Sequence, residues 1–261
     1  MKSLCFILVL LVSASVGTIH ASANGHKVKE LKIGESFGGV DGTVVIQNVT
    51  TDKEYIYNKK RSVIRYTPES TFKVANALIG LQTKAISDEY EVKRWDGVVR
   101  EFEDWNRDHS LASGMRYSVI WFYQAMARDI GAENMQQYVD KLNYGNRDLS
   151  GGIDHFWLDS SLNISAKEQV RFIENLVDEK LPIDKQHMRT VKRIMINEEA
   201  DDYVLHGKTG TRLSDMGLGW YVGYIETDKG TWAFATNLDG SGSTAKAITL
   251  DALKKLEIIK Q

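Results

Sequence analysis

The stretch PESTFKVANALIG, residues 68–80, places a lysine at the start of a mostly apolar run. Ser70 precedes Lys73 by three positions, and the residues from Val74 to Leu81 are those of a buried helix. An unpaired ammonium is costly to bury, so a lysine in this position normally loses its proton or finds partners. If a helix begins near Ser70, both side chains lie on one face, and the amine can reach the hydroxyl. A serine beside an amine base is one arrangement for nucleophilic catalysis, and a helix cap followed by a surface-seeking lysine is the alternative.

Two elements further along the chain favour the catalytic interpretation. Ser118 offers a second hydroxyl, and Lys208, Thr209 and Gly210 follow a strand-like run. A lysine and a hydroxyl at the end of a strand can bind a carboxylate, while the glycine lets the backbone approach a ligand. A serine–lysine element, a second serine and a Lys-Thr-Gly element, in this order, are typical of class A β-lactamases and penicillin-binding proteins.

The composition indicates a folded protein with a substantial core. The chain has 261 residues, of which 43% are hydrophobic and 26% charged. The net charge is −2 and no lysine- or arginine-rich block is present, which argues against nucleic acid as a partner. The six histidines show no metal-ligand spacing, so we expect no metal.

The first 23 residues have the features of a signal peptide. Lys2 gives a positive start, Leu4 to Val12 is apolar, and Ala21-Ser22-Ala23 fits the cleavage pattern. The apolar part is too short to span a bilayer as a mature helix. We therefore expect a secreted protein of residues 24–261 that keeps no stable membrane anchor after cleavage. The only cysteine, Cys5, lies in this leader, so the mature core must hold without a disulfide.

Strand-like segments gather at the two ends of the chain, and helical periodicity fills the middle. The expected strands cover residues 42–49, 53–58, 202–210, 217–226 and 231–240. The expected helices cover residues 71–84, 117–130, 132–142, 165–178, 184–196 and 248–259. Ser165 and Glu168 have the spacing of a capping box. The pattern predicts an α+β fold, in which an antiparallel sheet built from both chain ends is flanked by helices and accompanied by an all-helical lobe. A ligand cleft is expected between the lobes.

The chain resembles the class D, OXA-type serine β-lactamases, and among them those of Gram-positive bacilli. The matching elements are Ser70-Thr71-Phe72-Lys73, Ser118-Val119-Ile120, Tyr144-Gly145-Asn146, Phe156-Trp157-Leu158 and Lys208-Thr209-Gly210. The similarity continues through residues 93–97 and 104–109 and covers essentially all of residues 24–261. It implies one catalytic domain with the penicillin-binding transpeptidase-like fold, a small-molecule β-lactam substrate, and a monomer or weak dimer.

The resemblance also implies a role for each matching residue. Ser70 would be the nucleophile and Lys73 the general base, while Ser118 and Lys208 would pass protons and Trp157 would orient the base. Backbone N–H groups of Ser70 and Thr211 would form the oxyanion hole. The residues expected to contact substrate are Thr209, Gly210, Thr211, Ile120, Tyr144 and Arg212.

Lys73 is expected to be an N6-carboxylysine. In class A enzymes an asparagine amide ends the second element near the lysine, but here that position is Ile120, and Val119 precedes it. Apolar neighbours favour the neutral amine. A neutral amine can add carbon dioxide, and the Trp157 indole N–H is a suitable donor to the resulting carbamate. No cofactor is expected beyond this carbon dioxide or bicarbonate.

Two further features concern deacylation and substrate binding. Between Tyr144 and Pro182 no glutamate is followed four residues later by asparagine, the class A spacing, so one base should serve both half-reactions. Class D enzymes usually carry an arginine for the substrate carboxylate where this chain has Ala245. The neighbouring Lys246 is expected to point elsewhere, so carboxylate binding would depend on Lys208 and Thr209, helped by Arg212.

The function implied is hydrolysis of the β-lactam amide of penicillin-type antibiotics through a Ser70 acyl-enzyme. Two other functions use the same residues. A penicillin-binding D,D-peptidase would acylate without fast deacylation, and a non-catalytic β-lactam sensor would keep the acyl group.

Overall fold

The computed structural model describes residues 28–51 and 53–260. The expected signal peptide, with Cys5 and its cleavage site, lies outside these residues. No helix in the described part of the chain is both long and apolar enough to cross a membrane.

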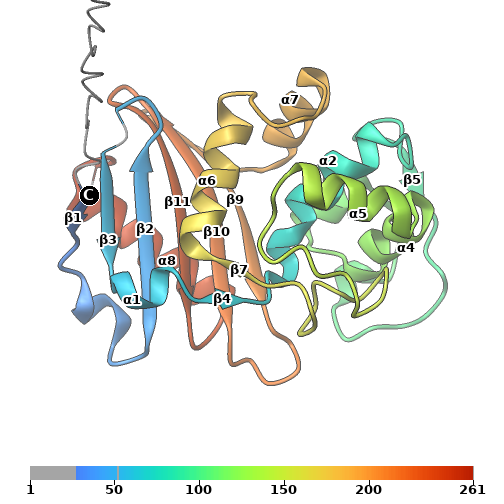
Figure 1. The fold of residues 1–261 in the computed structure, drawn as a ribbon, viewed down its shortest axis with the longest axis horizontal. Helices are drawn as coiled ribbons and strands as arrows, with labels where there is room; N and C mark the ends of the chain where they lie inside the picture. Colours follow the sequence, from blue (N-terminus) through green and yellow to red (C-terminus); the bar gives the residue numbers. More distant parts are fainter. Residues whose placement is uncertain (1–27, 52, 261) are drawn as a thin grey trace, which may run out of the picture.

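A seven-stranded sheet forms one lobe, and strands from both ends of the chain build it (Figure 1). Its strands are β1 (Val28–Glu30), β2 (Gly42–Asn48), β3 (Glu54–Tyr57), β8 (Ile196–Glu199), β9 (Tyr203–Thr211), β10 (Gly219–Thr227) and β11 (Gly230–Leu238). They lie in the order β1-β3-β2-β11-β10-β9-β8, so the β2–β11 pair joins the two chain ends. The sheet is antiparallel as expected, except that β1 pairs in parallel with β3. The short strand β1 was not expected from the sequence.

Helices cover the sheet and build a second lobe. The α-helices are α1 (Lys59–Ser62), α2 (Lys73–Gln82), α3 (Leu111–Arg116), α4 (Ile120–Ile130), α5 (Ala132–Lys141), α6 (Ala166–Val177), α7 (Lys185–Ile194) and α8 (Gly242–Lys255). Three 3-10 turns are η1 (Gly34–Phe37), η2 (Glu69–Phe72) and η3 (Glu103–Trp105). Two short ribbons pair β4 (Arg65–Tyr66) with β7 (Ile164–Ser165), and β5 (Val92–Lys93) with β6 (His109–Ser110).

Both faces of the sheet are buried, which explains why the central strands alternate between two apolar cores. Val45 belongs to the core that includes α6 and the helical lobe, whereas Val44 and Ile46 belong to the core under α8. Helix α6 packs on β2, β10 and β11, and α8 packs on β9, β10 and β11. At about 25 cal/mol per Å² of apolar surface, this burial is the main stabilising term for a domain in which no disulfide is expected.

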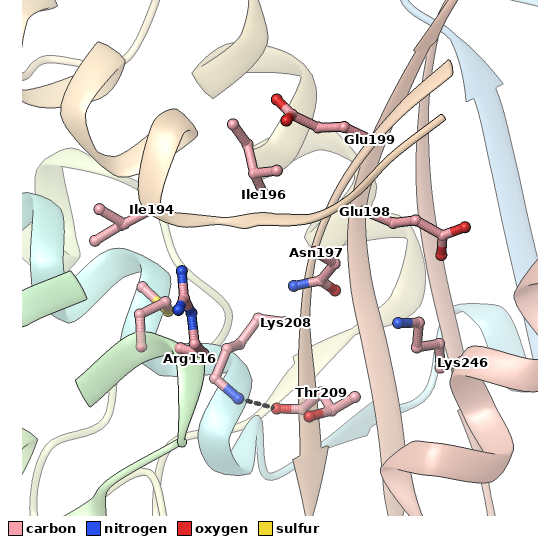
Figure 2. Close-up of a pocket in the computed structure, with 11 residues that line it drawn as sticks. Arg116, Ile194, Ile196, Asn197, Glu198, Glu199, Lys208, Thr209 and Lys246 are labelled. Atoms are coloured by element: carbon pink, nitrogen blue, oxygen red, sulfur yellow. Dashed lines mark hydrogen bonds between the residues drawn. The ribbon is translucent and has the colours of Figure 1, made fainter. Parts of the chain in front are cut away.

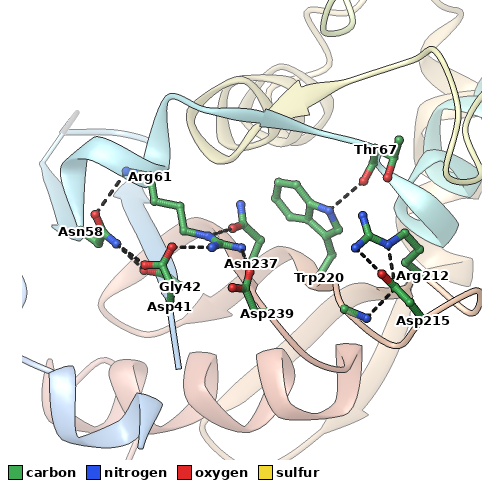
Figure 3. A network of polar contacts seen from close by, with 11 residues as sticks. Asp41, Gly42, Asn58, Arg61, Thr67, Arg212, Asp215, Trp220, Asn237 and Asp239 are labelled. Atoms are coloured by element: carbon green, nitrogen blue, oxygen red, sulfur yellow. Dashed lines mark hydrogen bonds and ion pairs between the residues drawn. The ribbon is translucent and has the colours of Figure 1, made fainter. Parts of the chain in front are cut away.

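A buried arginine ties the two chain ends together beside the β2–β11 pair (Figure 3). The Arg61 guanidinium pairs with Asp41 at 2.6 Å and with Asp239 at 2.7 Å, and its Nε donates to Asn237 at 2.8 Å. Asp41 precedes β2 and Asp239 follows β11, so the three interactions fix neighbouring ends of these strands.

Several helix boundaries differ from the expectation, and two of the differences matter for function. The helix expected from Tyr117 begins only at Ile120, because Ser118 has a left-handed backbone (φ +56°) that separates α3 from α4. The last helix begins at Gly242 rather than at Ile248, because Ser241 caps it by accepting a hydrogen bond from the amide of Thr244. The capping box expected at Ser165 is confirmed.

Candidate active site

The predicted contact between Ser70 and Lys73 is present. Ser70 lies on the 3-10 turn η2 and Lys73 is the first residue of α2, so the two side chains meet across one turn. The Lys73 Nζ and the Ser70 Oγ are 2.7 Å apart. Ser70 is 8% exposed and Lys73 is 0% exposed, so the hydroxyl reaches the surface while the amine does not. The pair has the geometry for transfer of the serine proton to the amine.

Burial holds the pKa of Lys73 well below its usual range, and the positive charge of Lys208 adds to this effect. Glu69 acts in the opposite direction but does not outweigh them. The ring of Tyr123 lies over the amine, with its centroid 5.5 Å from Nζ. Val119 is fully buried in the same core. Burial in this apolar environment therefore disfavours the protonated form of Lys73.

Trp157 carries an indole N–H that has no hydrogen-bond acceptor in the described part of the chain, although the atom is buried. Its ring stacks on Phe72 at 5.5 Å and meets Phe156 edge-on at 4.9 Å, which fixes the orientation of the indole. A buried donor without a partner costs about 1–3 kcal/mol, so an acceptor for this N–H would be stabilising. Phe72 lies between Ser70 and Lys73 in sequence, so the indole is held against the turn that carries the nucleophile.

Glu69 ties the nucleophile turn to the segment that carries Trp157, a role that the sequence did not indicate. The Glu69 amide donates to the carbonyl of Trp157 at 3.0 Å. Its carboxylate accepts from the Thr67 hydroxyl at 2.6 Å and from the Asp159 amide at 2.9 Å. Burial raises the pKa of this carboxyl, while the Thr67 hydrogen bond lowers it. The amide and the carboxylate of Glu69 thus hold Ser70 and Trp157 in fixed positions relative to one another.

Ser118 and Lys208 connect the helical lobe to the sheet. The Lys208 Nζ donates to the Ser118 Oγ and to the carbonyl of Thr209, both at 2.9 Å. Burial lowers the pKa of Lys208 to about 7. The side chain can therefore exchange a proton near neutral pH, and the hydroxyl of Ser118 is its neighbour for that exchange.

A cleft of about 160 Å³ lies between the two lobes, as expected, and both Ser70 and Ser118 line it. It is lined by Ser70, Phe102, Trp105, Tyr117, Ser118, Ile120, Thr209, Thr211 and Leu213. Phe102, Trp105 and Leu213 were not singled out by sequence reasoning, because an isolated aromatic or leucine in a loop carries no motif.

Gly210 lets β9 approach the nucleophile turn closely. A Cβ at this position would lie 3.1 Å from the carbonyl oxygen of Pro68 and 3.3 Å from the amide nitrogen of Ser70. These separations are tighter than ordinary van der Waals contacts, so a side chain here would push β9 away from Ser70. Glycine at position 210 therefore permits the close approach of β9 to Ser70.

Three expected substrate contacts, Gly210, Tyr144 and Arg212, do not line the cleft. Tyr144 is 1% exposed and packs edge-on against Phe72 and Phe172, so it supports the turn from inside the core rather than touching substrate. Arg212 does not line the cleft either. Its guanidinium pairs with Asp215 through two contacts of 2.8 Å, and Asp215 is the main cause of its raised pKa (Figure 3).

Ala245 and Lys246 lie in the first two turns of α8. Ala245 is fully buried in the core that α8 forms with the sheet, so it offers no group to a substrate carboxylate, as expected, and an arginine at this position would enter a packed core. Lys246, which was expected to point elsewhere, is absent from the lining of the Ser70 cleft but lines the adjoining pocket with Lys208 and Thr209 (Figure 2). The reason is the earlier start of α8, which places Lys246 in the second turn of the helix beside β9.

Comparisons with known proteins identify the family of the chain. Residues 9–256 match the family described as the penicillin binding protein transpeptidase domain. The chain is 54% identical to the probable beta-lactamase YbxI of Bacillus subtilis (strain 168), over 99% of each chain. It is 37% identical to beta-lactamase OXA-48 of Klebsiella pneumoniae, over 99% of this chain and 100% of the other. The solved structure of the class D beta-lactamase BAT-2 matches with a TM-score of 0.85 and 60% identity, over 87% of this chain and 96% of the other. The chain therefore belongs to the class D serine β-lactamases, enzymes with the penicillin-binding transpeptidase fold, and it resembles those of Gram-positive bacilli.

Proposed function

We propose that the protein hydrolyses the β-lactam amide of penicillin-type antibiotics through a covalent acyl-enzyme on Ser70. The observation that carries the proposal is the 2.7 Å contact between the Ser70 hydroxyl and the buried amine of Lys73. Burial lowers the pKa of this amine, which favours the neutral form that can accept the hydroxyl proton.

In the first half-reaction Lys73 takes the proton of Ser70, and Oγ bonds to the β-lactam carbonyl carbon. The amide C–N bond then breaks, and the leaving nitrogen takes a proton from the hydroxyl of Ser118. Lys208 returns a proton to Ser118 across the 2.9 Å contact, which its pKa of about 7 permits. The proton that Lys73 took from Ser70 then replaces the proton that Lys208 gave, so Lys73 is a neutral base again before deacylation. The N–H groups of Ser70 and Thr211 would stabilise the oxyanion, since Gly210 brings the end of β9 against the Ser70 turn.

In the second half-reaction Lys73 takes a proton from a water molecule, and the water oxygen bonds to the acyl carbon. Oγ leaves with the proton held by Lys73, which restores the enzyme. One base serves both steps, because the sequence offers no glutamate with the class A spacing.

We propose further that Lys73 works as an N6-carboxylysine. When bound, carbon dioxide would give the amine an anionic carbamate that is a suitable proton acceptor. Two observations support this form. Burial lowers the pKa of Lys73, which shifts it toward the neutral amine that carbon dioxide requires, and the buried Trp157 N–H has no acceptor within residues 28–51 and 53–260. A carbamate oxygen would satisfy that donor.

Hydrolysis is separated from the two other functions by two measurements on the same preparation. We expect rapid nitrocefin turnover and only a transient penicilloyl adduct in intact-protein mass spectra. A stable adduct without turnover would indicate a D,D-peptidase or a sensor instead. Ser70→Ala is the control, which should show neither signal.

We also propose that the protein is exported after removal of residues 1–23. The support is the sequence pattern of the leader, which lies outside the described residues. N-terminal sequencing of protein recovered from the culture medium tests this. A mature protein that begins near Asn24 is expected, and retention of Met1 on protein inside the cells would contradict export.

A further inference from the structure

A second pocket, of about 510 Å³, adjoins the Ser70 cleft on the other side of Thr209. It is lined by Met115, Arg116, Ile194, Ile196, Asn197, Glu198, Glu199, Gly207, Lys208, Thr209 and Lys246. Strand β8 pairs with β9 only from Val204 to His206, so the pocket lies beside the part of β9 that β8 leaves unpaired. Thr209 lines both spaces, so a ligand at Ser70 can extend into this pocket.

Two cations in this pocket have no anionic partner. Figure 2 shows Arg116 and Lys208 on one side of Thr209 and Lys246 on the other. In the described part of the chain, the side chains of Arg116 and Lys246 make no ion pair and no hydrogen bond. The one recorded contact of Lys246 is with the Tyr221 ring, whose centroid lies 5.9 Å from Nζ.

In the described part of the chain, neither glutamate of the pocket forms an ion pair with Arg116 or Lys246. Glu198 accepts from the hydroxyl of Tyr203 at 2.5 Å, and Glu199 lies at the far end of the pocket in Figure 2. Asn197 accepts from the hydroxyl of Tyr221 at 2.9 Å. The end of the pocket next to Lys208 is therefore positively charged and open to an anion.

The chemical structure of penicillins indicates which anionic group of the substrate would enter this end of the pocket. The leaving nitrogen belongs to a ring whose neighbouring carbon carries a carboxylate. If Ser118 and Lys208 deliver the proton to that nitrogen, the carboxylate must lie within a few ångströms of Lys208 and Thr209. The Lys208 Nζ already donates hydrogen bonds to Ser118 Oγ and to the carbonyl of Thr209, so few of its N–H donors remain for the carboxylate.

We propose that Arg116 and Lys246 bind the ring carboxylate of the substrate and so replace the arginine that Ala245 lacks. This inference rests on the proposed function and names the residues that recognise its substrate. Arg116 offers a planar pair of donors, and Lys246 offers a point charge from the opposite side of Thr209. Arg116 is exposed and Lys246 is half-buried, so each contributes a modest share of the affinity.

The test compares benzylpenicillin with its methyl ester, which lacks the negative charge, in Arg116→Gln, Lys246→Gln and the double variant. We expect each single variant to raise KM for benzylpenicillin roughly three- to tenfold, with kcat within about twofold. KM for the ester should stay unchanged. The control is Lys254→Gln, an exposed lysine on the same helix outside the pocket, which should alter neither substrate.

Unchanged KM in all variants, or an equal rise for acid and ester, would overturn the assignment. Binding to protein that also carries Ser70→Ala gives a second readout that needs no turnover. There, calorimetry should show that Arg116→Gln weakens the Kd of benzylpenicillin by a similar factor. If wild-type protein neither turns over nor forms an adduct, the proposed function fails, while this binding comparison still decides the carboxylate site.

Discussion

The unpaired indole N–H of Trp157 gives the carbamate proposal a sharp test. Trp157→Phe keeps an aromatic ring against Phe72 but removes the donor. A hydrogen bond to a charged acceptor contributes about 1.5–3 kcal/mol. Since each 1.4 kcal/mol is a factor of ten, the variant should need roughly 10- to 150-fold more bicarbonate for half-occupancy of the carbamate.

The assay is ¹³C NMR of the protein in ¹³C-labelled bicarbonate at fixed pH, with the carbamate signal followed as bicarbonate is added. Thermal unfolding gives an independent readout. A ligand at 100 times its Kd stabilises the folded state by about 2.7 kcal/mol, so bicarbonate should raise the Tm of the wild type more than that of Trp157→Phe.

Trp232→Phe is the matched control. Trp232 also has a buried indole N–H without an acceptor in the described chain, but it lies on β11 in the core under α8. Its replacement should leave half-occupancy unchanged. If Trp157→Phe binds carbon dioxide as tightly as the wild type, the indole does not contact a carbamate and the reasoning is refuted.

Three other predictions follow from the geometry of the Ser70 turn. Ser70→Ala should abolish covalent labelling by penicillin while circular dichroism stays native, and a penicilloyl mass on this variant would show that another residue is the nucleophile. Gly210→Ala should lower the rate of acylation about tenfold, because its Cβ crowds Ser70 N and Pro68 O; an unchanged rate in stopped-flow acylation would show that β9 can shift freely. Glu69→Ala should lower the free energy of unfolding by about 1–3 kcal/mol, because the Thr67 hydroxyl and the Asp159 amide lose their acceptor. Glu69→Gln, which keeps an oxygen acceptor, should lose much less in urea denaturation, and equal losses would show that the charge matters rather than the hydrogen bonds.

The sequence predicted those parts of the site that depend on local spacing. Ser70 and Lys73 are three residues apart at a helix start, so their contact follows from helical geometry alone. The contact of Ser118 with Lys208 spans ninety residues, and it was expected only through the resemblance to class D enzymes.

The remaining features depend on long-range packing, which spacing does not encode. Tyr144 is the first residue of a family motif, yet its ring packs in the core against Phe72. The orientation of Lys246 depends on where α8 begins, and the Ser241 cap that sets this start lies in a stretch without helical periodicity. The partner of Arg212, Asp215, is close in sequence and could have been found from the three-residue separation.

The most direct test of the proposed mechanism is the rate of benzylpenicillin hydrolysis by the wild-type protein in carbon-dioxide-free buffer at mildly acidic pH. Burial holds the folded-state pKa of Lys73 well below its usual range, which favours the neutral amine that binds carbon dioxide. As the pH falls, protons return to the amine and the carbamate is lost, whereas added bicarbonate at the same pH restores it. We predict a low rate that recovers when bicarbonate is added. Identical rates with and without bicarbonate would contradict the carbamate and show that Lys73 works as a free amine.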